Sequence, residues 1–137
     1  MTEFLRMSGM YWGLTALDLM DKLDSVPKDD VIAFIQDCFD ENCGGFSPAK
    51  DHDPHILYTL SAIQILAMYD EFKSVDTSKV VGFVQSLQQP DGSFFGDKWG
   101  EVDIRFTFCA VATLSLLVRI QKSHQFSFFY YTINIYC

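Results

Sequence analysis

Residues 53–66 recur with similar side chains as residues 101–114, which lie 48 positions further along the chain. An earlier segment resembles the same unit at an offset of 46 positions. The matched positions include Trp12, Tyr58 and Phe106, then Ala16, Ala62 and Ala110. A period of this length is typical of stacked supersecondary units, each of which contacts its neighbours. The chain therefore predicts a repeat array rather than one irregular core.

Five helices are predicted from apolar residues spaced three and four positions apart. They cover residues 4–23, 29–39, 53–69, 76–87 and 103–117. The first, third and fifth are apolar nearly all round, which is typical of buried helices, whereas the second and fourth have a polar face. The sequence thus predicts an all-α fold with two concentric layers, in which the odd helices lie inside and the even helices outside.

Turn and capping residues divide these helices. Asp53 is expected to cap the third helix, with Pro54 in its first turn, and Asp76 to cap the fourth. Glycine-phenylalanine turns at residues 44–46 and 92–94 follow the second and fourth helices. Glycine adopts backbone angles there that other residues reach only at a cost.

Composition narrows the class of protein. A net charge of −8 and an isoelectric point near 4.6 argue against a nucleic-acid surface, which needs clustered Lys and Arg. The sequence shows neither a secretory signal nor an apolar run long enough for a membrane span. Four cysteines have no disulfide-scaffold spacing, and Cys38 and Cys109 are expected to pack as small apolar residues. We expect a reduced, cytoplasmic protein without an integral membrane segment.

A boundary is predicted between residues 117 and 118. Residues 1–117 carry all 18 acidic groups, whereas residues 118–137 carry none and are rich in aromatic, β-prone side chains. We interpret residues 1–117 as a partial repeat domain and residues 118–137 as an unmatched, aggregation-prone tail. Our hypothesis is that the tail derives from retained intron sequence or from a mis-spliced transcript.

Three segments carry a resemblance to a known family. Residues 6–14, 52–62 and 96–106, with a Gln-x-x-x-Gly-x-Phe turn at residues 88–94, resemble the protein prenyltransferase β-subunit family. Within that family they are most similar to β subunits of Rab geranylgeranyltransferase, the type II enzyme. More distantly, the repeats resemble terpene cyclases. The resemblance covers residues 2–117.

The resemblance implies an α-α toroid, here as an incomplete ring. It implies transfer of a geranylgeranyl group from geranylgeranyl diphosphate to C-terminal cysteines of a Rab GTPase, which an escort protein presents. A zinc ion would activate the cysteine thiolate by lowering its pKa. An α subunit is the implied partner.

Matched residue by residue, the chain retains candidates for the isoprenoid-binding wall. The residues expected to contact isoprene units are Trp12, Tyr58 and Phe108. Ser8 and Leu60 are expected to leave room for a twenty-carbon chain. Arg105 matches an arginine of the family's inner wall near the cavity. The alternative is that these are core residues, because aromatic stripes usually pack. If Trp12, Tyr58 and Phe106 share one inward direction, they line a cavity.

No residue of this chain matches the family's zinc ligands or diphosphate-binding residues, so no catalytic or metal residue is assigned. The Asp and His residues at positions 51–55 contain metal-ligand types. We reject a metal site there, because Asp53 is expected to serve as a helix cap.

Two hypotheses follow. The first is a truncated β subunit of Rab geranylgeranyltransferase that is inactive alone and folds poorly, because its inner helices lack neighbours. The second is a non-catalytic α-hairpin array that binds the α subunit or another protein.

Overall fold

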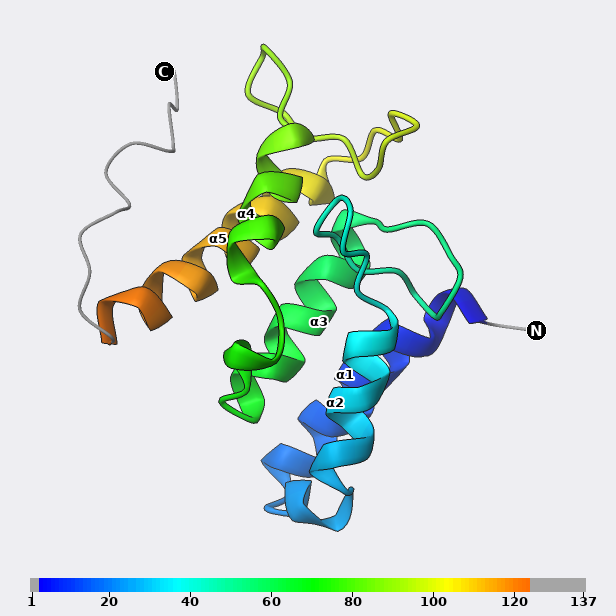
Figure 1. Cartoon of the computed structure of the whole chain (residues 1–137), viewed down its shortest axis with the longest axis vertical. Helices are drawn as coiled ribbons and strands as arrows, with labels where there is room; N and C mark the ends of the chain where they lie inside the picture. The colour runs from blue at the N-terminus through cyan, green and yellow to red at the C-terminus, as the bar shows by residue number, and fades with distance from the viewer. Residues whose placement is uncertain (1–2, 124–137) are drawn as a thin grey trace.

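The computed structural model describes residues 3–123, with side chains through Val118 (Figure 1). Its α-helices are α1 (Arg6–Leu19), α2 (Lys28–Asp37), α3 (Ile56–Met68), α4 (Thr77–Ser86) and α5 (Arg105–Ser123). The 3-10 helices are η1 (Glu3–Leu5), η2 (Leu23–Ser25) and η3 (Phe72–Ser74). Within residues 3–123 the only β pairing consists of isolated bridges. The predicted all-α class is confirmed.

The odd-numbered helices lie side by side, with α3 between α1 and α5 (Figure 1). α3 is enclosed, since eight of its 13 residues are buried. By contrast, only Met7 and Leu14 are buried in α1. The prediction of helices buried all round is therefore confirmed for α3 and wrong for α1, and it is also wrong for α5, which exposes Phe108 and Val111. The physical reason is that α3 has an inner-layer neighbour on both sides, whereas α1 has one on a single side.

Two core clusters attach the outer helices to this inner layer. The first joins α1, α2 and α3 through residues that include Leu14, Ile35 and Leu66. The second joins α3, α4 and α5 through residues that include Leu60 and Phe106. The apolar stripes predicted for the outer helices are the faces that enter these clusters, so the predicted packing of α2 and α4 is confirmed.

Helix starts show one confirmed and one wrong prediction. Asp76 caps α4, since its side chain accepts a hydrogen bond from the Ser78 backbone N–H. Asp53 does not cap α3, which begins at Ile56 with His55 as its capping residue. The Asp53 carboxylate instead accepts hydrogen bonds from Lys98 and Trp99, 2.6 Å and 3.2 Å away.

The first helix is shorter than the predicted residues 4–23. It ends at Leu19, and Asp21 then takes the left-handed conformation, with a φ of 55°. Asp70 does the same after α3, with a φ of 52°. The structure thus ends both inner helices with the same turn, which is a further sign of the repeat.

The two predicted glycine turns are confirmed. Gly44 and Gly92 both have left-handed backbone angles, with φ values of 84° and 87°. Phe46 and Phe94, two residues later in each turn, are buried. Each turn therefore places an aromatic anchor in the core at the end of an outer helix.

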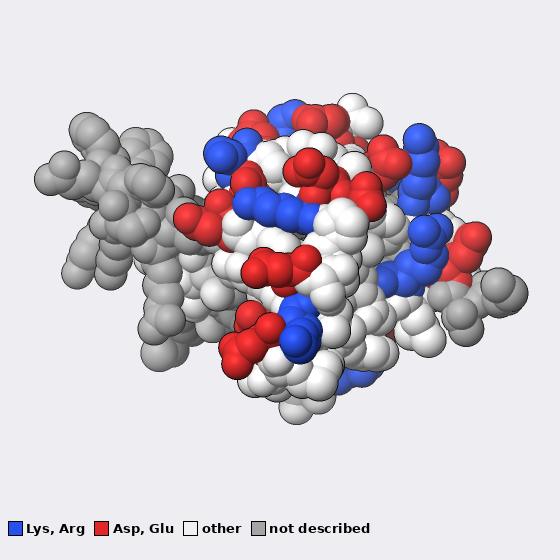
Figure 2. Space-filling model, turned by 90° about the horizontal axis from the view of Figure 1, so that it is seen from below, with Lys and Arg blue, Asp and Glu red and all other residues white. Residues whose placement is uncertain are grey.

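Charged side chains of both signs lie next to one another on the face shown in Figure 2. Ion pairs also join successive repeats. Lys28 at the start of α2 pairs with Glu71 after α3, at 2.7 Å, and Lys79 of α4 pairs with Glu41 after α2. None of the helices within residues 3–123 combines the length and apolar character that a membrane span requires.

α5 continues past the predicted boundary at residue 117, to Ser123. The boundary itself stays a prediction. Residues 124–137, which hold most of the predicted aggregation-prone tail, lie outside the described residues. Cys38 and Cys109 are buried free thiols, as expected from their place on helix faces.

Candidate functional site

The six candidate wall residues lie in the first two turns of the three inner helices. They are Ser8 and Trp12 in α1, Tyr58 and Leu60 in α3, and Arg105 and Phe108 in α5. The inner helices run in the same general direction (Figure 1). The fold therefore brings all six candidates toward one end of the inner layer.

Burial separates these candidates. Trp12 and Phe108 are 60% and 69% exposed, so neither is a core residue of the described chain. Leu60 is 7% exposed and belongs to the core cluster between α3 and α5. Ser8 and Tyr58 are half-buried. Leu60 is therefore a core residue, as the alternative interpretation of these candidates proposed. Trp12 and Phe108 are exposed and can contact a ligand or another surface.

The predicted aromatic column is wrong at Phe106. Its ring is fully buried and lies edge-on to the His55 ring, with 5.1 Å between centroids. It does not share the exposure of Trp12, its equivalent in α1. Phe106 is therefore a core residue at the start of α5 and does not line an open cavity beside Trp12.

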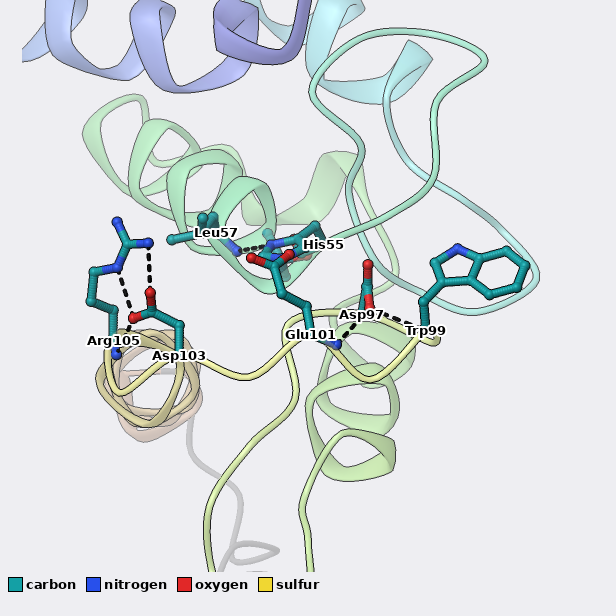
Figure 3. A network of polar contacts seen from close by, with 8 residues as sticks. His55, Leu57, Asp97, Trp99, Glu101, Asp103 and Arg105 are labelled. Atoms are coloured by element: carbon teal, nitrogen blue, oxygen red, sulfur yellow. Dashed lines mark hydrogen bonds and ion pairs between the residues drawn. The ribbon is translucent and has the colours of Figure 1, made fainter.

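Arg105 is held by the capping residue of its own helix (Figure 3). Its Nε and Nη2 atoms donate to the two carboxylate oxygens of Asp103, each at 2.8 Å, and its backbone N–H donates to the same carboxylate. These hydrogen bonds from Arg105 lower the pKa of Asp103 to about 2. A two-point pair of this kind fixes the direction of the guanidinium group.

This ion pair predicts a specific pH dependence. The folded-state pKa of Asp103 lies below the value of about 3.9 for an unfolded chain, so its ionised form stabilises the fold above that value. The contribution should disappear as pH falls from about 4 toward about 2. Asp103→Asn keeps a capping oxygen but removes the charge. Urea unfolding should show wild type more stable than Asp103→Asn at pH 6, with the difference vanishing at pH 2. A difference that is constant with pH would contradict this assignment.

His55 is a structural residue that the sequence interpretation missed, because the helix start was assigned to Asp53. Its Nδ1 accepts the backbone N–H of Leu57, at 3.1 Å. The ring proton therefore lies on Nε2, which faces a Glu101 carboxylate oxygen 3.0 Å away (Figure 3). The ring also packs between Tyr58 and Phe106. His55 thus joins the start of α3 to the loop before α5.

His55, Asp97 and Glu101 are the one group within the described residues that has the spacing of a metal site, with ligand atoms within 4.8 Å of one another. A histidine ligand needs a free nitrogen lone pair. Here the Nδ1 lone pair accepts the Leu57 N–H and Nε2 carries the proton. Asp97 also accepts the backbone N–H groups of Trp99 and Glu101. The group therefore fits a hydrogen-bonded loop anchor and does not fit a zinc site.

The histidines and aspartates at positions 51–55 do not converge on one point. His52 pairs with Glu3 at 3.1 Å, whereas Asp53 pairs with Lys98. We rejected a metal site at these positions because Asp53 was expected to cap α3. That reason is wrong, because His55 caps the helix. A salt bridge to Lys98 and a hydrogen bond from Trp99 occupy the Asp53 carboxylate instead.

Comparison with known proteins matches residues 1–134 to the prenyltransferase alpha-alpha toroid domain. The chain belongs to this family. The predicted toroid class is thereby confirmed, and α1, α3 and α5 are its inner helices.

Individual members of the prenyltransferase family resemble the chain closely. It is 45% identical over 134 residues to the geranylgeranyl transferase type-2 subunit beta of Candida albicans. It is also 45% identical over 120 residues to the protein of that name from Saccharomyces cerevisiae. These matches cover 90% and 85% of this chain, but only 39% and 37% of the relatives. The Arabidopsis thaliana subunit beta 1 is 58% identical over 65 residues, 47% of this chain and 20% of its own length.

Proposed function

We propose that this chain is part of the β subunit of a type-2 geranylgeranyl transferase and contributes part of its isoprenoid-binding wall. The names of the relatives support the reaction class. The observation that supports the wall most directly is that Trp12 in α1 and Phe108 in α5, both within the first two turns of their helices, keep exposed rings, with α3 and Tyr58 between them. An exposed aromatic side chain offers an apolar surface of the kind that binds part of an isoprenoid chain.

In this proposal the residues of the chain bind and orient the lipid. Trp12, Tyr58 and Phe108 contact isoprene units, and each buried CH₂ group of the lipid contributes roughly 0.8 kcal/mol. Ser8, which is half-buried, leaves room along the wall for a twenty-carbon chain, whereas Leu60, the other candidate for this role, lies in the core between α3 and α5. Arg105 stands at the start of α5, where Asp103 fixes its guanidinium group.

The remaining parts of the reaction are also proposals. The substrates are geranylgeranyl diphosphate and a Rab GTPase presented by an escort protein, and the partner is an α subunit. The zinc ion of the family's reaction is not held by residues 3–123, because the closest candidate group does not fit it. Buried free thiols favour a cytoplasmic location. Residues 1–117 form the partial repeat domain, and this chain alone does not catalyse transfer.

Lipid binding can be followed through Trp12. In a Trp99→Phe background, Trp12 is the single tryptophan of the chain. Geranylgeranyl diphosphate below its micellar concentration should give a saturable blue shift of the emission, whereas inorganic diphosphate should give none. Phe108→Ala should weaken binding by roughly tenfold to hundredfold, because one large apolar contact contributes about 1.5–3 kcal/mol.

The matched control is Val102→Ala, which alters another exposed apolar side chain outside the wall. This variant should bind the lipid like the parent. The absence of any lipid-dependent shift would contradict the proposed wall. If Val102→Ala lost as much affinity as Phe108→Ala, the proposed location of the lipid wall would be wrong.

A further inference from the structure

His55 is a polar side chain at the junction of two successive repeats, and it is only 8% exposed. Its Nδ1 accepts the Leu57 backbone N–H at 3.1 Å, and its Nε2 lies 3.0 Å from a carboxylate oxygen of Glu101 (Figure 3). The two hydrogen bonds use both ring nitrogens, so together they fix the tautomer and the orientation of the ring. One edge of the ring is thus bound to α3 and the other to the loop before α5.

The loop before α5 passes directly over this ring. A Cβ atom built at Gly96 would lie 2.3 Å from His55 Nε2 and 2.6 Å from the Phe106 ring. The Gly96 carbonyl also accepts the Ile56 backbone N–H, at 2.8 Å. Glycine permits this close approach of the backbone. The loop therefore packs against the start of α3 with His55 between them.

Tyr58 is the wall candidate that His55 touches. The two rings lie 5.7 Å apart, measured between centroids. Three positions separate the two residues, which places them on one face at the start of α3. Burial and the negative charge of Glu101 raise the pKa of the Tyr58 hydroxyl, so the Glu101 carboxylate also acts on this side chain. His55 and Glu101 therefore form the surroundings in which Tyr58 takes its orientation.

The same hydrogen bond leads to the wall candidates of α5. Glu101 precedes Arg105 by four positions, and Phe106 meets the His55 ring edge-on at 5.1 Å. Phe108 follows within the next turn of α5. A displacement of Glu101 would therefore move the start of α5 relative to Tyr58.

We propose that His55 is a positioning residue of the isoprenoid wall. It acts without touching the lipid, because its ring orients Tyr58 and its hydrogen bond to Glu101 sets the spacing between α3 and α5. This inference rests on the proposed function, since the wall must bind lipid for its positioning to matter. When fewer chains hold the wall residues in place, the apparent dissociation constant rises in inverse proportion to their fraction.

The test compares His55→Asn and Glu101→Ala in the full chain, with Trp12 fluorescence and geranylgeranyl diphosphate, in the Trp99→Phe background as parent. Asparagine keeps an oxygen that caps α3 but ends one atom short of Nε2, so it cannot reach Glu101. Each variant should raise the apparent dissociation constant by about threefold to tenfold, as expected if about a tenth to a third of the chains stay competent. Glu101 is exposed, so Glu101→Ala tests the same hydrogen bond even if His55→Asn fails to fold.

Two further variants separate a shared hydrogen bond from unrelated effects. Glu101→Gln keeps an acceptor for the Nε2–H and should recover most of the affinity that Glu101→Ala loses. The double variant His55→Asn/Glu101→Ala should bind no more weakly than His55→Asn, because both changes remove one interaction. Losses that multiply in the double variant, or no recovery in Glu101→Gln, would overturn the proposal.

Val31→Ala is the matched control for stability. Val31 is buried in the first turn of α2, in the outer layer, so its truncation loosens the core without altering a wall candidate. At a temperature where circular dichroism shows the variants to be folded, Val31→Ala should bind lipid like the parent. If it lost as much affinity as His55→Asn, the effect at His55 would be one of stability alone and the positioning role would be wrong.

The parent chain distinguishes failure of this inference from failure of the proposed function. A parent without any lipid-dependent shift contradicts the wall and the positioning role together. A parent that binds lipid, with His55→Asn and Glu101→Ala binding equally well, contradicts the positioning role alone and leaves the wall in place.

Discussion

Replacing Phe106 by alanine is expected to lower the free energy of unfolding by about 3–5 kcal/mol. The same change at Phe108, two residues later in α5, is expected to alter it by about 0.5 kcal/mol or less. The two residues have the same side chain and neighbouring positions in one helix. Phe106 is fully buried against His55 and the α3–α5 core, whereas Phe108 is mostly exposed. Comparison of Phe106→Ala with Phe108→Ala therefore measures the effect of burial on stability for the same side chain.

Urea unfolding followed by circular dichroism provides the measurement. Equal losses in Phe106→Ala and Phe108→Ala would show that both rings are core residues. That result would remove the main support for the lipid wall. A loss confined to Phe106→Ala supports the exposed position of Phe108.

Exposed apolar side chains also affect the stability of the isolated chain. Large apolar side chains that remain exposed include Phe4, Leu5, Trp12, Leu19, Met20, Trp99, Val102, Ile104, Phe108 and Val111. Burial of one such side chain contributes roughly 1.5–3 kcal/mol, against a total domain stability of about 5–15 kcal/mol. Poor folding of the isolated chain therefore stays our prediction.

The repeat made most of the fold predictable. Because residues one period apart share their chemistry, the offset alone predicted which helices lie side by side and which turns use glycine. Those features depend on periodicity, which a single sequence displays directly.

Burial at the two ends of the array could not be predicted in the same way. Ile56 and Ile104 are chemically identical and occupy equivalent positions, yet one is buried and the other exposed. A repeated pattern encodes the face that each unit presents and does not encode whether a neighbour is present. Trp12 and Phe106, two rings of the expected aromatic column, differ in exposure for a related reason. Phe106 packs against the preceding inner helix, whereas Trp12 has no preceding helix to contact in the described part of the chain.

The start of α3 shows how a distant contact overrides a local rule. Asp53 and Pro54 have the local features of a helix start. Lys98 and Trp99, which lie more than 40 positions away, bind the Asp53 carboxylate, and His55 caps the helix instead. No local pattern contains these partners. The signal that was present is the recurrence of Asp53 as Glu101, which marks both positions as loop anchors between repeats.

Replacing Gly44 by alanine is expected to destabilise the fold far more than the same change at Gly92. Both glycines have left-handed backbone angles, so alanine costs roughly 1–2 kcal/mol at either position. Of these two glycines, only Gly44 has neighbouring atoms where a Cβ would lie. A Cβ atom built there would lie 2.2 Å from the backbone oxygen of Lys79, whereas nothing lies within 4 Å of one built at Gly92.

The obstacle at Gly44 is backbone, so a rotamer change cannot relieve it. Lys79 lies in the first turn of α4, and its side chain also binds Glu41 in the loop that contains Gly44. The loop and α4 would have to separate, which we expect to add roughly 1–3 kcal/mol. Gly44→Ala should therefore cost about 2–5 kcal/mol in total. The melting temperature should fall by roughly 6 °C or more.

Thermal unfolding of wild type, Gly44→Ala and Gly92→Ala tests this difference, with Gly92→Ala as the control for the backbone angle alone. Equal decreases in melting temperature would mean that the loop after α2 does not pack rigidly against α4. A decrease much larger for Gly44→Ala would show that successive repeats are joined by direct backbone packing at this turn.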